Sequence, residues 1–155
     1  MAEKKFESNL IIERPIDEVF AFFSKAENLQ RITPPSLDFF IVTPLPIEMK
    51  KGTLIDYRLK IRGVPSKWKT LISEWSPPTS FTDTQLKGPY KKWVHNHKFT
   101  KINDRSTQMV DTVVYEVPFG ILGNLVNYLI VRHEVAKIFK HRNKTILKHF
   151  ETKPV

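Results

Sequence analysis

The sequence predicts an α+β fold in which a curved antiparallel sheet of six to seven strands wraps around one long C-terminal helix, with two short helices after the first strand. Two observations carry this prediction. From residue 37 to residue 116, strand-like alternation is interrupted by turn residues about every ten positions, which is typical of a meandering antiparallel sheet. From Phe119 to about Phe150, apolar residues recur at three- and four-residue steps without a proline, which predicts a long amphipathic helix.

The N-terminal part is predicted to form a strand and then two short helices. The segment Phe6–Arg14 is the first strand. Pro15 begins a helix at the position where its missing N–H is harmless, and the apolar face of this helix consists of Ile16, Val19, Phe20 and Phe23. A second short helix around Ser24–Arg31 ends at Thr33-Pro34-Pro35.

The middle of the chain is predicted to add four more strands, Leu37–Thr43, Gly52–Arg62, Ser66–Trp75 and Phe81–Lys87. Side chains alternate between the two faces of a strand, so each of these strands presents one set to the interior. The sets on the last three strands are Ile55, Tyr57, Leu59 and Ile61, then Trp68, Thr70 and Ile72, then Phe81, Asp83 and Gln85.

A predicted hairpin formed by Gly88–Phe99 and Ser106–Glu116 carries the residues richest in chemistry. A three-residue loop, Asn103-Asp104-Arg105, is predicted to connect its strands. That loop length places His97 opposite Asp111, His95 opposite Val113, and Trp93 opposite Tyr115. We therefore expect two imidazoles, a carboxylate and several aromatic rings on one interior wall.

The two halves of the C-terminal helix differ in composition. The first half, around Ile121–Val131, is apolar nearly all round, and we expect the sheet to cover it. An alternative is that this half is an interaction surface for another protein or for a membrane interface. The second half is expected to need only one buried stripe, with Lys137, Lys140, Arg142, Lys144 and Lys148 pointing outward.

Length and composition bound the protein class. The 155 residues predict a single domain, 1–155, and the absence of cysteine excludes disulfides, thiolate metal sites and cysteine nucleophiles. The N-terminus lacks the apolar run of a signal peptide, and the apolar stretch Val117–Val131 is too short to span a bilayer. We expect a cytoplasmic protein without stable membrane insertion, either a monomer or a homodimer.

The net charge of +9 raises the question of nucleic-acid binding. The basic residues are spread along the chain, with pairs such as Lys50-Lys51 and Lys91-Lys92 but no block of five or six. Binding to DNA or RNA requires a concentrated basic footprint. A solvated basic surface is therefore the favoured interpretation, and nucleic acid is not an expected partner.

A cavity is expected between the sheet and the helix, because one helix about 10 Å wide cannot fill a strongly curved sheet. Aromatic surface supplies affinity for a small molecule, and a few convergent polar groups fix its orientation. The alternative is a satisfied polar cluster within a core, but buried polar groups need partners, ligand or water. The predicted ligand-binding residues are Tyr57, Trp68, Thr70, Gln85, Trp93, His95, His97, Asp111 and Tyr115.

Three features carry a resemblance to a known family: Phe6, the run Pro15-Ile16-Asp17-Glu18-Val19-Phe20, and the terminal helix. With them the sequence resembles the START-like superfamily (SRPBCC, helix-grip fold), and the resemblance covers essentially the whole chain. That superfamily includes birch-pollen-allergen proteins, lipid-transfer domains and polyketide cyclases/dehydrases. The sequence resembles one bacterial branch of this superfamily at more positions. Members of that branch are labelled ligand-binding, cyclase/dehydrase-like or cell-division-inhibitor-like proteins. The positions are Thr33-Pro34-Pro35, Thr43-Pro44, Gly63-Val64-Pro65, Trp68, Pro77-Pro78, Asp83, Gln85, Gly88-Pro89-Tyr90, Trp93, His95, His97, Asp111, Tyr115 and Pro118-Phe119-Gly120. The resemblance implies a cavity for a hydrophobic ligand, but such a fold hosts many activities.

Four functional hypotheses remain open at this point. The first is binding, transport or sequestration of a small hydrophobic or aromatic molecule, with Gln85, His95 and His97 fixing its polar end. The second is a cyclase, dehydratase or hydrolase in which Asp111 orients His97 as general base or acid, Tyr57 or Tyr115 donates a proton, and His95 is a further catalytic candidate. The third is a zinc site on His95 and His97 with Asp111, although His-x-His is a weak signal. The fourth is a protein-interaction module such as a cell-division regulator. No cofactor and no metal are expected.

Overall fold

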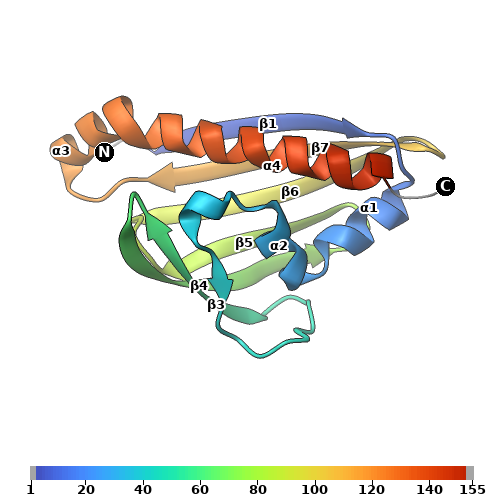
Figure 1. The fold of residues 1–155 in the computed structure, drawn as a ribbon, viewed down its shortest axis with the longest axis horizontal. Helices are drawn as coiled ribbons and strands as arrows, with labels where there is room; N and C mark the ends of the chain where they lie inside the picture. The colour runs from blue at the N-terminus through green and yellow to red at the C-terminus, as the bar shows by residue number, and fades with distance from the viewer. Residues whose placement is uncertain (1–2, 153–155) are drawn as a thin grey trace.

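The computed structural model describes residues 3–152 and contains one seven-stranded antiparallel sheet that curls around the C-terminal helix (Figure 1). The strands are β1 (Lys4–Ile12), β2 (Phe40–Ile41), β3 (Leu54–Ile61), β4 (Val64–Ser76), β5 (Ser80–Lys87), β6 (Lys92–Asn103) and β7 (Ser106–Glu116), in the spatial order β1-β7-β6-β5-β4-β3-β2. The helical elements are α1 (Ile16–Phe23), α2 (Ala26–Ile32), the 3-10 turn η1 (Pro35–Leu37), α3 (Gly120–Val126), the π-helical turn η2 (Asn127–Val131) and α4 (Arg132–Thr152). The predicted fold class is confirmed.

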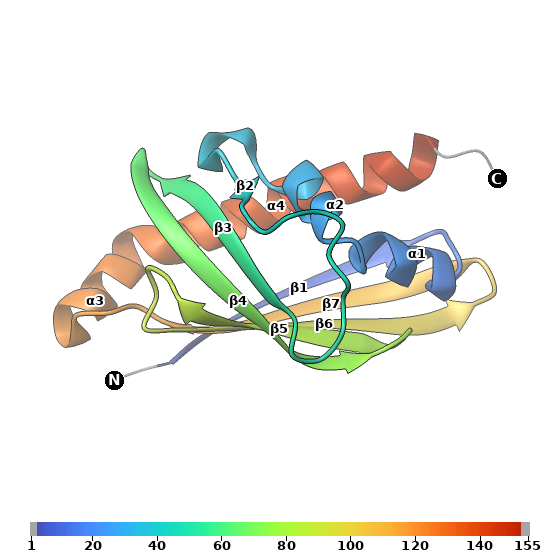
Figure 2. The same ribbon diagram turned by 90° about the horizontal axis from the view of Figure 1, so that it is seen from below.

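The sheet bends where β4 pairs with β5. The pairing register shifts there twice, between Lys69 and Thr70 and between Ile72 and Glu74. Such irregularities increase the local twist of a sheet. As a result β3 and β4 rise toward α4, whereas β1, β6 and β7 run beneath the helix (Figure 2). This bend creates the space between sheet and helix.

The predicted register of the β6–β7 hairpin is confirmed, but its loop is shorter than expected. His97 lies opposite Asp111, His95 opposite Val113, and Trp93 opposite Tyr115. Only Asp104 and Arg105 separate the two strands, rather than three residues. A register shift between Lys101 and Asn103 takes up the difference. The residue expected in the loop instead forms a bulge in β6, so the pairing of β6 with β7 from Lys101 back to Lys92 is as predicted.

Several element boundaries also differ from the prediction. The strand predicted at Leu37–Thr43 is reduced to two residues, because η1 occupies its start and Asp38 follows in the left-handed region at φ 45°. Strand β1 begins two residues earlier than predicted. Val64 and Pro65, expected in a turn, are the first residues of β4.

Helix α4 packs on the sheet through a stripe that includes one charged residue. Its buried side chains are Val135, Phe139, Arg142, Ile146 and Phe150, at steps of three and four. The prediction that Arg142 points outward is therefore wrong. Position 142 falls in the buried stripe by helical spacing. The outward prediction rested on the charge of its side chain instead. Arg142 is held inside by the buried Asp111 on β7, whose Oδ1 lies 3.5 Å from Arg142 Nη2.

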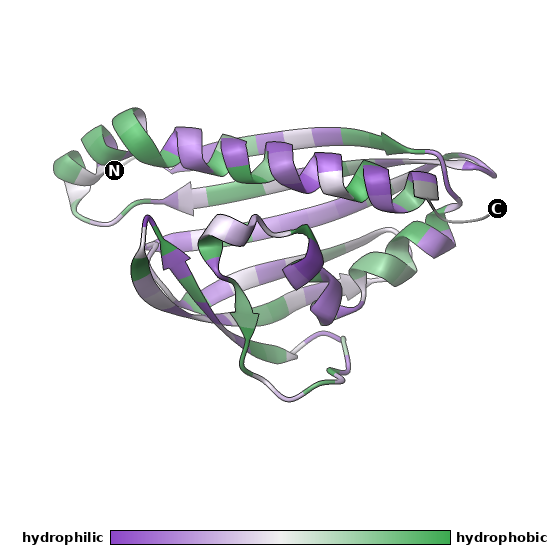
Figure 3. Ribbon diagram, in the orientation of Figure 1, coloured by the Kyte–Doolittle hydropathy of each residue, from purple (hydrophilic) through white to green (hydrophobic). Residues whose placement is uncertain are grey.

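The apolar first half of the C-terminal helix is exposed, contrary to the expectation that the sheet covers it. The strands that lie beneath the helix stop at this end, since β7 ends at Glu116 and pairs there with the start of β1 and β6. No strand is left to face α3, which projects past the sheet with apolar residues on its surface (Figure 3). We call the exposed set the apolar tip; it comprises Phe119, Ile121, Leu122, Leu125, Val126, Tyr128, Leu129 and Ile130. Within residues 3–152, no helix is both long and apolar enough to cross a bilayer.

Candidate functional site

A cavity of about 190 Å³ lies between the concave face of the sheet, α2 and α4. One water molecule needs only about 10–15 Å³ of such volume, so the cavity has room for a much larger molecule. Its wall is mainly apolar. Aliphatic and aromatic side chains from α2, β3, β4 and α4 make up most of it, among them Ile32, Ile55, Leu59, Ile72 and Ile138.

Six of the nine predicted site residues line this cavity: Tyr57, Trp68, Thr70, Trp93, His95 and His97. They come from β3, β4 and β6, and they lie on one wall because strand residues two apart share a face. The other three, Gln85, Asp111 and Tyr115, are not part of the cavity surface. Each of these three contacts a different part of the protein.

Gln85 fastens the turn between β5 and β6. Its Nε2 donates to the carbonyl oxygen of Tyr90 at 2.7 Å, and its Oε1 accepts from the Tyr90 backbone N–H at 3.3 Å. Gly88 lies so close to the Gln85 side chain that a Cβ there would clash with it. Gln85 is thus occupied by backbone groups. The turn it closes presents the Tyr90 ring to the cavity.

Tyr115 anchors the start of the C-terminal helix. Its hydroxyl donates to Asn127 Oδ1 at 2.8 Å, and both residues are buried. Burial raises the pKa of the Tyr115 phenol. The hydroxyl is therefore a structural donor to η2 rather than a group that faces a ligand.

Asp111 lies behind the two histidines and holds both of them. Its Oδ1 is 2.7 Å from His95 Nε2 and 3.1 Å from His97 Nδ1. Arg142 Nη2 approaches the same oxygen at 3.5 Å. All four side chains are buried, so these interactions are shielded from water.

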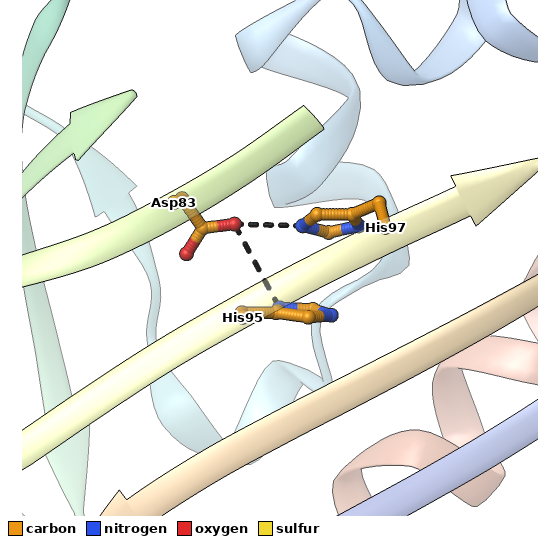
Figure 4. A group of neighbouring side chains, drawn as sticks. All are labelled: Asp83, His95 and His97. Atoms are coloured by element: carbon orange, nitrogen blue, oxygen red, sulfur yellow. Dashed lines mark hydrogen bonds and ion pairs between the residues drawn. The ribbon is translucent and has the colours of Figure 1, made fainter. Parts of the chain in front are cut away.

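A second carboxylate, Asp83 on β5, holds the other edge of the pair (Figure 4). Asp83 Oδ2 is 2.7 Å from His97 Nε2 and 3.8 Å from His95 Nδ1. The His95 and His97 rings stack with their centroids 3.7 Å apart. His97 is also stacked on Phe81 at 4.1 Å, so His97 is held on both faces and at both nitrogens.

The two histidines have opposite electrostatic settings. Burial alone would lower the pKa of His97, but its hydrogen bonds to Asp111 and Asp83 outweigh burial and raise it. Burial and the neighbouring His97 charge lower the pKa of His95, and its contacts with the two carboxylates do not overcome them. We therefore assign His97 as an imidazolium and His95 as a neutral ring that donates from Nε2 to Asp111.

Both carboxylates stay ionised for the same reason. Burial would raise the pKa of Asp111, but the Arg142 guanidinium and the hydrogen bonds from the histidines hold it well below its ordinary range. The pKa of Asp83 is likewise lowered against burial; with His95 neutral, the hydrogen bond and the charge of His97 supply this effect. Two negative charges then face two positive charges, Arg142 and His97. The buried cluster is electrically neutral as a whole.

Aromatic side chains form another part of the wall. Trp68, Tyr90 and Trp93 contact one another, with ring centroids between 4.8 and 5.8 Å apart. Tyr57 adds a buried phenol whose pKa is raised, first by burial and then by Asp83, and which hydrogen-bonds to Thr70. It is a neutral hydroxyl at physiological pH. The wall thus combines flat apolar surface with a small number of polar groups.

The region of the cavity near the β3–β4 turn is bridged by an ion pair. Arg62 Nη1 lies 3.1 Å from Glu134 Oε1 on α4, and both residues contribute to the cavity lining while remaining partly open to solvent. The bridge links the tip of the β3–β4 hairpin to the helix. It is one of few charged contacts on the otherwise apolar rim.

The described residues contain one group with the composition of a metal site: Asp83, His95 and His97. The sequence had suggested Asp111 instead of Asp83 as the carboxylate. Zinc is bound by histidine nitrogens at about 2.0–2.1 Å, and the metal lies near the plane of each ring. Here His97 Nε2 and His95 Nδ1 face the same carboxylate oxygen, Asp83 Oδ2, at 2.7 and 3.8 Å. Hydrogen bonding and ion pairing account for the group as it stands.

Three residues that line the cavity are absent from the predicted site: Asp83, Arg142 and Tyr90. Asp83 was recognised on the same face as Phe81 and Gln85, but its partner strand was not considered. Arg142 was assigned to the solvent face, and Tyr90 was regarded as a turn residue. Only the pairing of β5 with β6, which sets Asp83 opposite His95 and Phe81 opposite His97, reveals the first of these.

Comparison with solved structures identifies the fold. A START superfamily protein from Mycobacterium smegmatis superposes with a TM-score of 0.71 at 13% identity, covering 95% of this chain and 97% of that chain. Zhui aromatase/cyclase from a Streptomyces species gives a TM-score of 0.68 at 14% identity, covering 93% and 94%. Norcoclaurine synthase from Thalictrum flavum, in complex with dopamine and hydroxybenzaldehyde, gives 0.66 at 15% identity, covering 99% and 90%. No protein-family model matches the sequence, and no curated protein matches it.

The protein therefore has a START-like (SRPBCC) helix-grip fold, as the sequence resemblance implied. Identities of 13–15% to these structures define the architecture and nothing finer. What the chain does has to be argued from its own cavity and polar cluster.

Proposed function

We propose that this protein binds a small, largely apolar molecule with an aromatic or polar end in the cavity between the sheet and α4. The observation that carries the proposal is the cavity itself: about 190 Å³ of space walled by apolar side chains, with a few polar groups on one side. Pockets for small molecules have this composition. A core built only for stability would be packed closely by side chains.

The apolar wall and the Trp68, Tyr90 and Trp93 rings supply area for affinity. The polar wall supplies orientation. Arg142 lines the cavity, and its buried Nε has no hydrogen-bond partner within the described structure. An unsatisfied buried donor is costly, so an acceptor oxygen on the ligand fits this position.

The charge balance of the polar cluster favours a neutral acceptor over an anion. Asp83 and Asp111 are already matched by Arg142 and the His97 imidazolium. Beside this cluster a carboxylate would add a buried charge that neither Arg142 nor His97 is free to match, which is strongly unfavourable. A carbonyl or a phenolic hydroxyl could accept from Arg142 without that penalty.

The first experiment is native mass spectrometry of the purified protein, followed by extraction and identification of any molecule that co-purifies. The proposal expects an apolar compound that carries a carbonyl or phenol oxygen. Binding of the extracted compound is then measured by calorimetry on protein freed of it.

A cavity-filling variant tests where such a compound binds. Ile138→Trp places a large ring into the cavity from α4, and we expect it to weaken binding by about tenfold or more because the ligand and the ring compete for the same volume. The matched control is Leu147→Trp, an exposed position on the same helix. Equal affinity in both variants would show that the ligand binds elsewhere.

A second candidate function is acid–base catalysis on the bound molecule, and one observation favours it. His95 lines the cavity, and its Nε2 is held by Asp111 at 2.7 Å, an arrangement that orients the ring and leaves Nδ1 as the acceptor. Both nitrogens of His97 are instead within 3.1 Å of a carboxylate. The geometry thus favours His95 over His97 as the general base with Asp111, and His97 as a fixed positive charge beside it.

The catalytic candidate is tested on the co-purifying compound by mass-spectrometric detection of product. His95→Gln is expected to remove turnover while leaving binding within about twofold. Absence of any product with the wild-type protein would leave binding as the function. Full turnover in His95→Gln would contradict the assignment of the base.

A further inference from the structure

The apolar tip is not covered by any strand or helix within residues 3–152, and it brings together eight of the exposed large hydrophobic residues there. Ile121 is 89% exposed and Phe119 is 80% exposed, and no charged residue occurs from Val117 to Val131. Of the eight tip residues, six are more than half exposed. Monomers rarely expose large contiguous apolar patches, and such patches mark interaction sites.

The tip is held in this position rather than loosely attached. Tyr115 Oη donates to Asn127 in the middle of the segment, and Val131 packs against the cluster that contains Val135 and Phe139. Gly123 lies against the Pro118 carbonyl, where a Cβ could not fit. The apolar side chains therefore point outward from a fixed helix, and refolding of the segment onto the sheet would break these contacts.

The distribution of the exposed side chains indicates what kind of surface covers them. At about 100° per residue, the exposed positions Ile121, Leu122, Leu125 and Val126 of α3 already span roughly 140° of the helix circumference, and η2 adds more exposed apolar side chains. A partner helix covers a stripe about 100° wide. An apolar phase that surrounds the helix on several sides matches the wider arc better than a single helical seam.

Charge supplies the second argument. The strand ends next to α3 carry Lys4, Lys5, Lys91 and Lys92, and Arg132 follows the tip; the nearby carboxylates are Glu3, Glu7, Glu116 and Glu134. Three of the lysines are ion-paired with Glu3, Glu7 and Glu116. The balance there is positive, five cations to four carboxylates, and the whole chain carries +9. Such a charge opposes association with a second identical copy and favours an anionic surface.

We propose that the apolar tip docks this protein reversibly on an anionic lipid surface, with α3 and η2 lying in the interfacial plane. An apolar helical segment flanked by basic residues binds membranes in this way, immersed by about 5–10 Å. The tip ends one helical turn before Glu134, which lines the cavity. Docking would thus bring the cavity rim close to the lipid surface.

Flotation of the purified protein with vesicles tests this proposal. The vesicles contain either phosphatidylcholine alone or phosphatidylcholine with phosphatidylserine, and each is used at low and at physiological salt. We expect the protein to float with the phosphatidylserine vesicles and to remain largely unbound with phosphatidylcholine alone. Higher salt is expected to reduce binding, since it screens the electrostatic part.

The test variant is Leu125→Glu with Leu129→Glu, and the control is Ile102→Glu. All three positions are exposed, and Ile102 lies at the β6–β7 hairpin, at the opposite end of the sheet from α3. The double variant is expected to lower the vesicle-bound fraction about tenfold or more, because two apolar contacts are replaced by anions. The control is expected to bind within about twofold of wild type. Circular dichroism and urea midpoints establish that both variants are folded.

Three outcomes would overturn the proposal. In the first, the wild-type protein floats with neither type of vesicle. In the second, the double variant and Ile102→Glu bind equally, which would assign binding to general charge rather than to the tip. In the third, sedimentation velocity shows that the wild-type protein forms concentration-dependent dimers, the double variant does not form them, and the wild-type protein does not bind vesicles. That result would assign the tip to a second copy of the chain.

Discussion

His95 and His97 are two residues apart on one face of β6, yet their partners give them different chemistry. His97 is held between two carboxylates and two rings, whereas His95 has one close carboxylate and a neighbouring positive charge. Asp111 and Asp83 thereby fix which ring carries the second proton. The cluster thus places a charged imidazolium and a neutral imidazole with their ring centroids 3.7 Å apart.

The protonation assignment predicts a pH-dependent stability. The pKa of His97 is raised in the folded protein above its ordinary value of about 6.5. Its stabilising contribution is therefore complete below about pH 6.5 and is lost as the pH rises through the folded-state pKa. We expect His97→Gln to be more destabilising near pH 6 than near pH 9, as measured by urea unfolding. A pH-independent difference would contradict the imidazolium assignment.

At lower pH the two carboxylates dominate the pH dependence of stability. The pKa values of Asp83 and Asp111 are lowered, so their contribution is complete above about pH 4 and is lost as the pH falls toward their folded-state values. The neutral His95 acts in the same direction from about pH 6.5 downward, since its pKa is also lowered. Ring nitrogen shifts in NMR spectra at pH 7 are expected to show one doubly protonated buried histidine and one neutral one.

Arg142 is the positive charge that lets two carboxylates stay buried. Arg142→Met keeps an unbranched side chain but removes the guanidinium, which leaves Asp111 and Asp83 with one counter-charge. Removing one partner from a buried ion pair costs about 3–5 kcal/mol, and we expect a loss of that size in the free energy of urea unfolding. The control is Lys144→Met on the exposed face of the same helix, which is expected to change stability by about 0.5 kcal/mol or less.

At the scale of elements, the β5–β6 connection shows how a polar side chain can serve the fold beside a binding cavity. Gln85 bonds both backbone groups of Tyr90 and so fixes the turn. The turn in turn places the Tyr90 ring beside Trp68 and Trp93. The effect of Gln85 on a ligand is therefore indirect.

Gln85→Ala tests this structural role. Two hydrogen bonds worth about 1 kcal/mol each are lost, so we expect a destabilisation of about 1–2 kcal/mol in urea unfolding and ligand affinity within about twofold of wild type. Gln108→Ala is the control, because the Gln108 side chain bonds Asn9 at an exposed site. Unchanged stability combined with lost binding would make Gln85 a ligand contact after all.

For the whole molecule, burial is uneven from one end to the other. Phe99, Met109 and Val113 are almost fully buried at the centre of β6 and β7, whereas α3 projects past the sheet. Amide hydrogen exchange is expected to be slowest in β6 and β7 and fastest among the helices in α3, because opening a segment with few buried contacts costs little. Protection of α3 equal to that of β7 in dilute, lipid-free protein would mean that another surface covers the apolar tip.

The sequence carried the fold and part of the site because both depend on local periodicity. Alternation along Gly52–Arg62 and Ser106–Glu116 defined the inward faces, and the short hairpin loop fixed which residues of β6 and β7 lie opposite each other. Six of the nine predicted site residues consequently line the cavity. Gln85 instead bonds the backbone of Tyr90, because alternation reports the face of a strand and not the partner that a side chain finds there.

By itself, the sequence determined the order of strands and helices, the curved sheet around a terminal helix, and the convergence of His95, His97 and Asp111, since each follows from side-chain period and turn length. The tertiary structure alone decided that Arg142 turns inward, that Asp83 completes the cluster, and that the apolar tip is uncovered. These depend on contacts between segments far apart in the chain and on where the sheet ends. Neither these contacts nor the end of the sheet can be predicted from the spacing of residues along one strand or one helix.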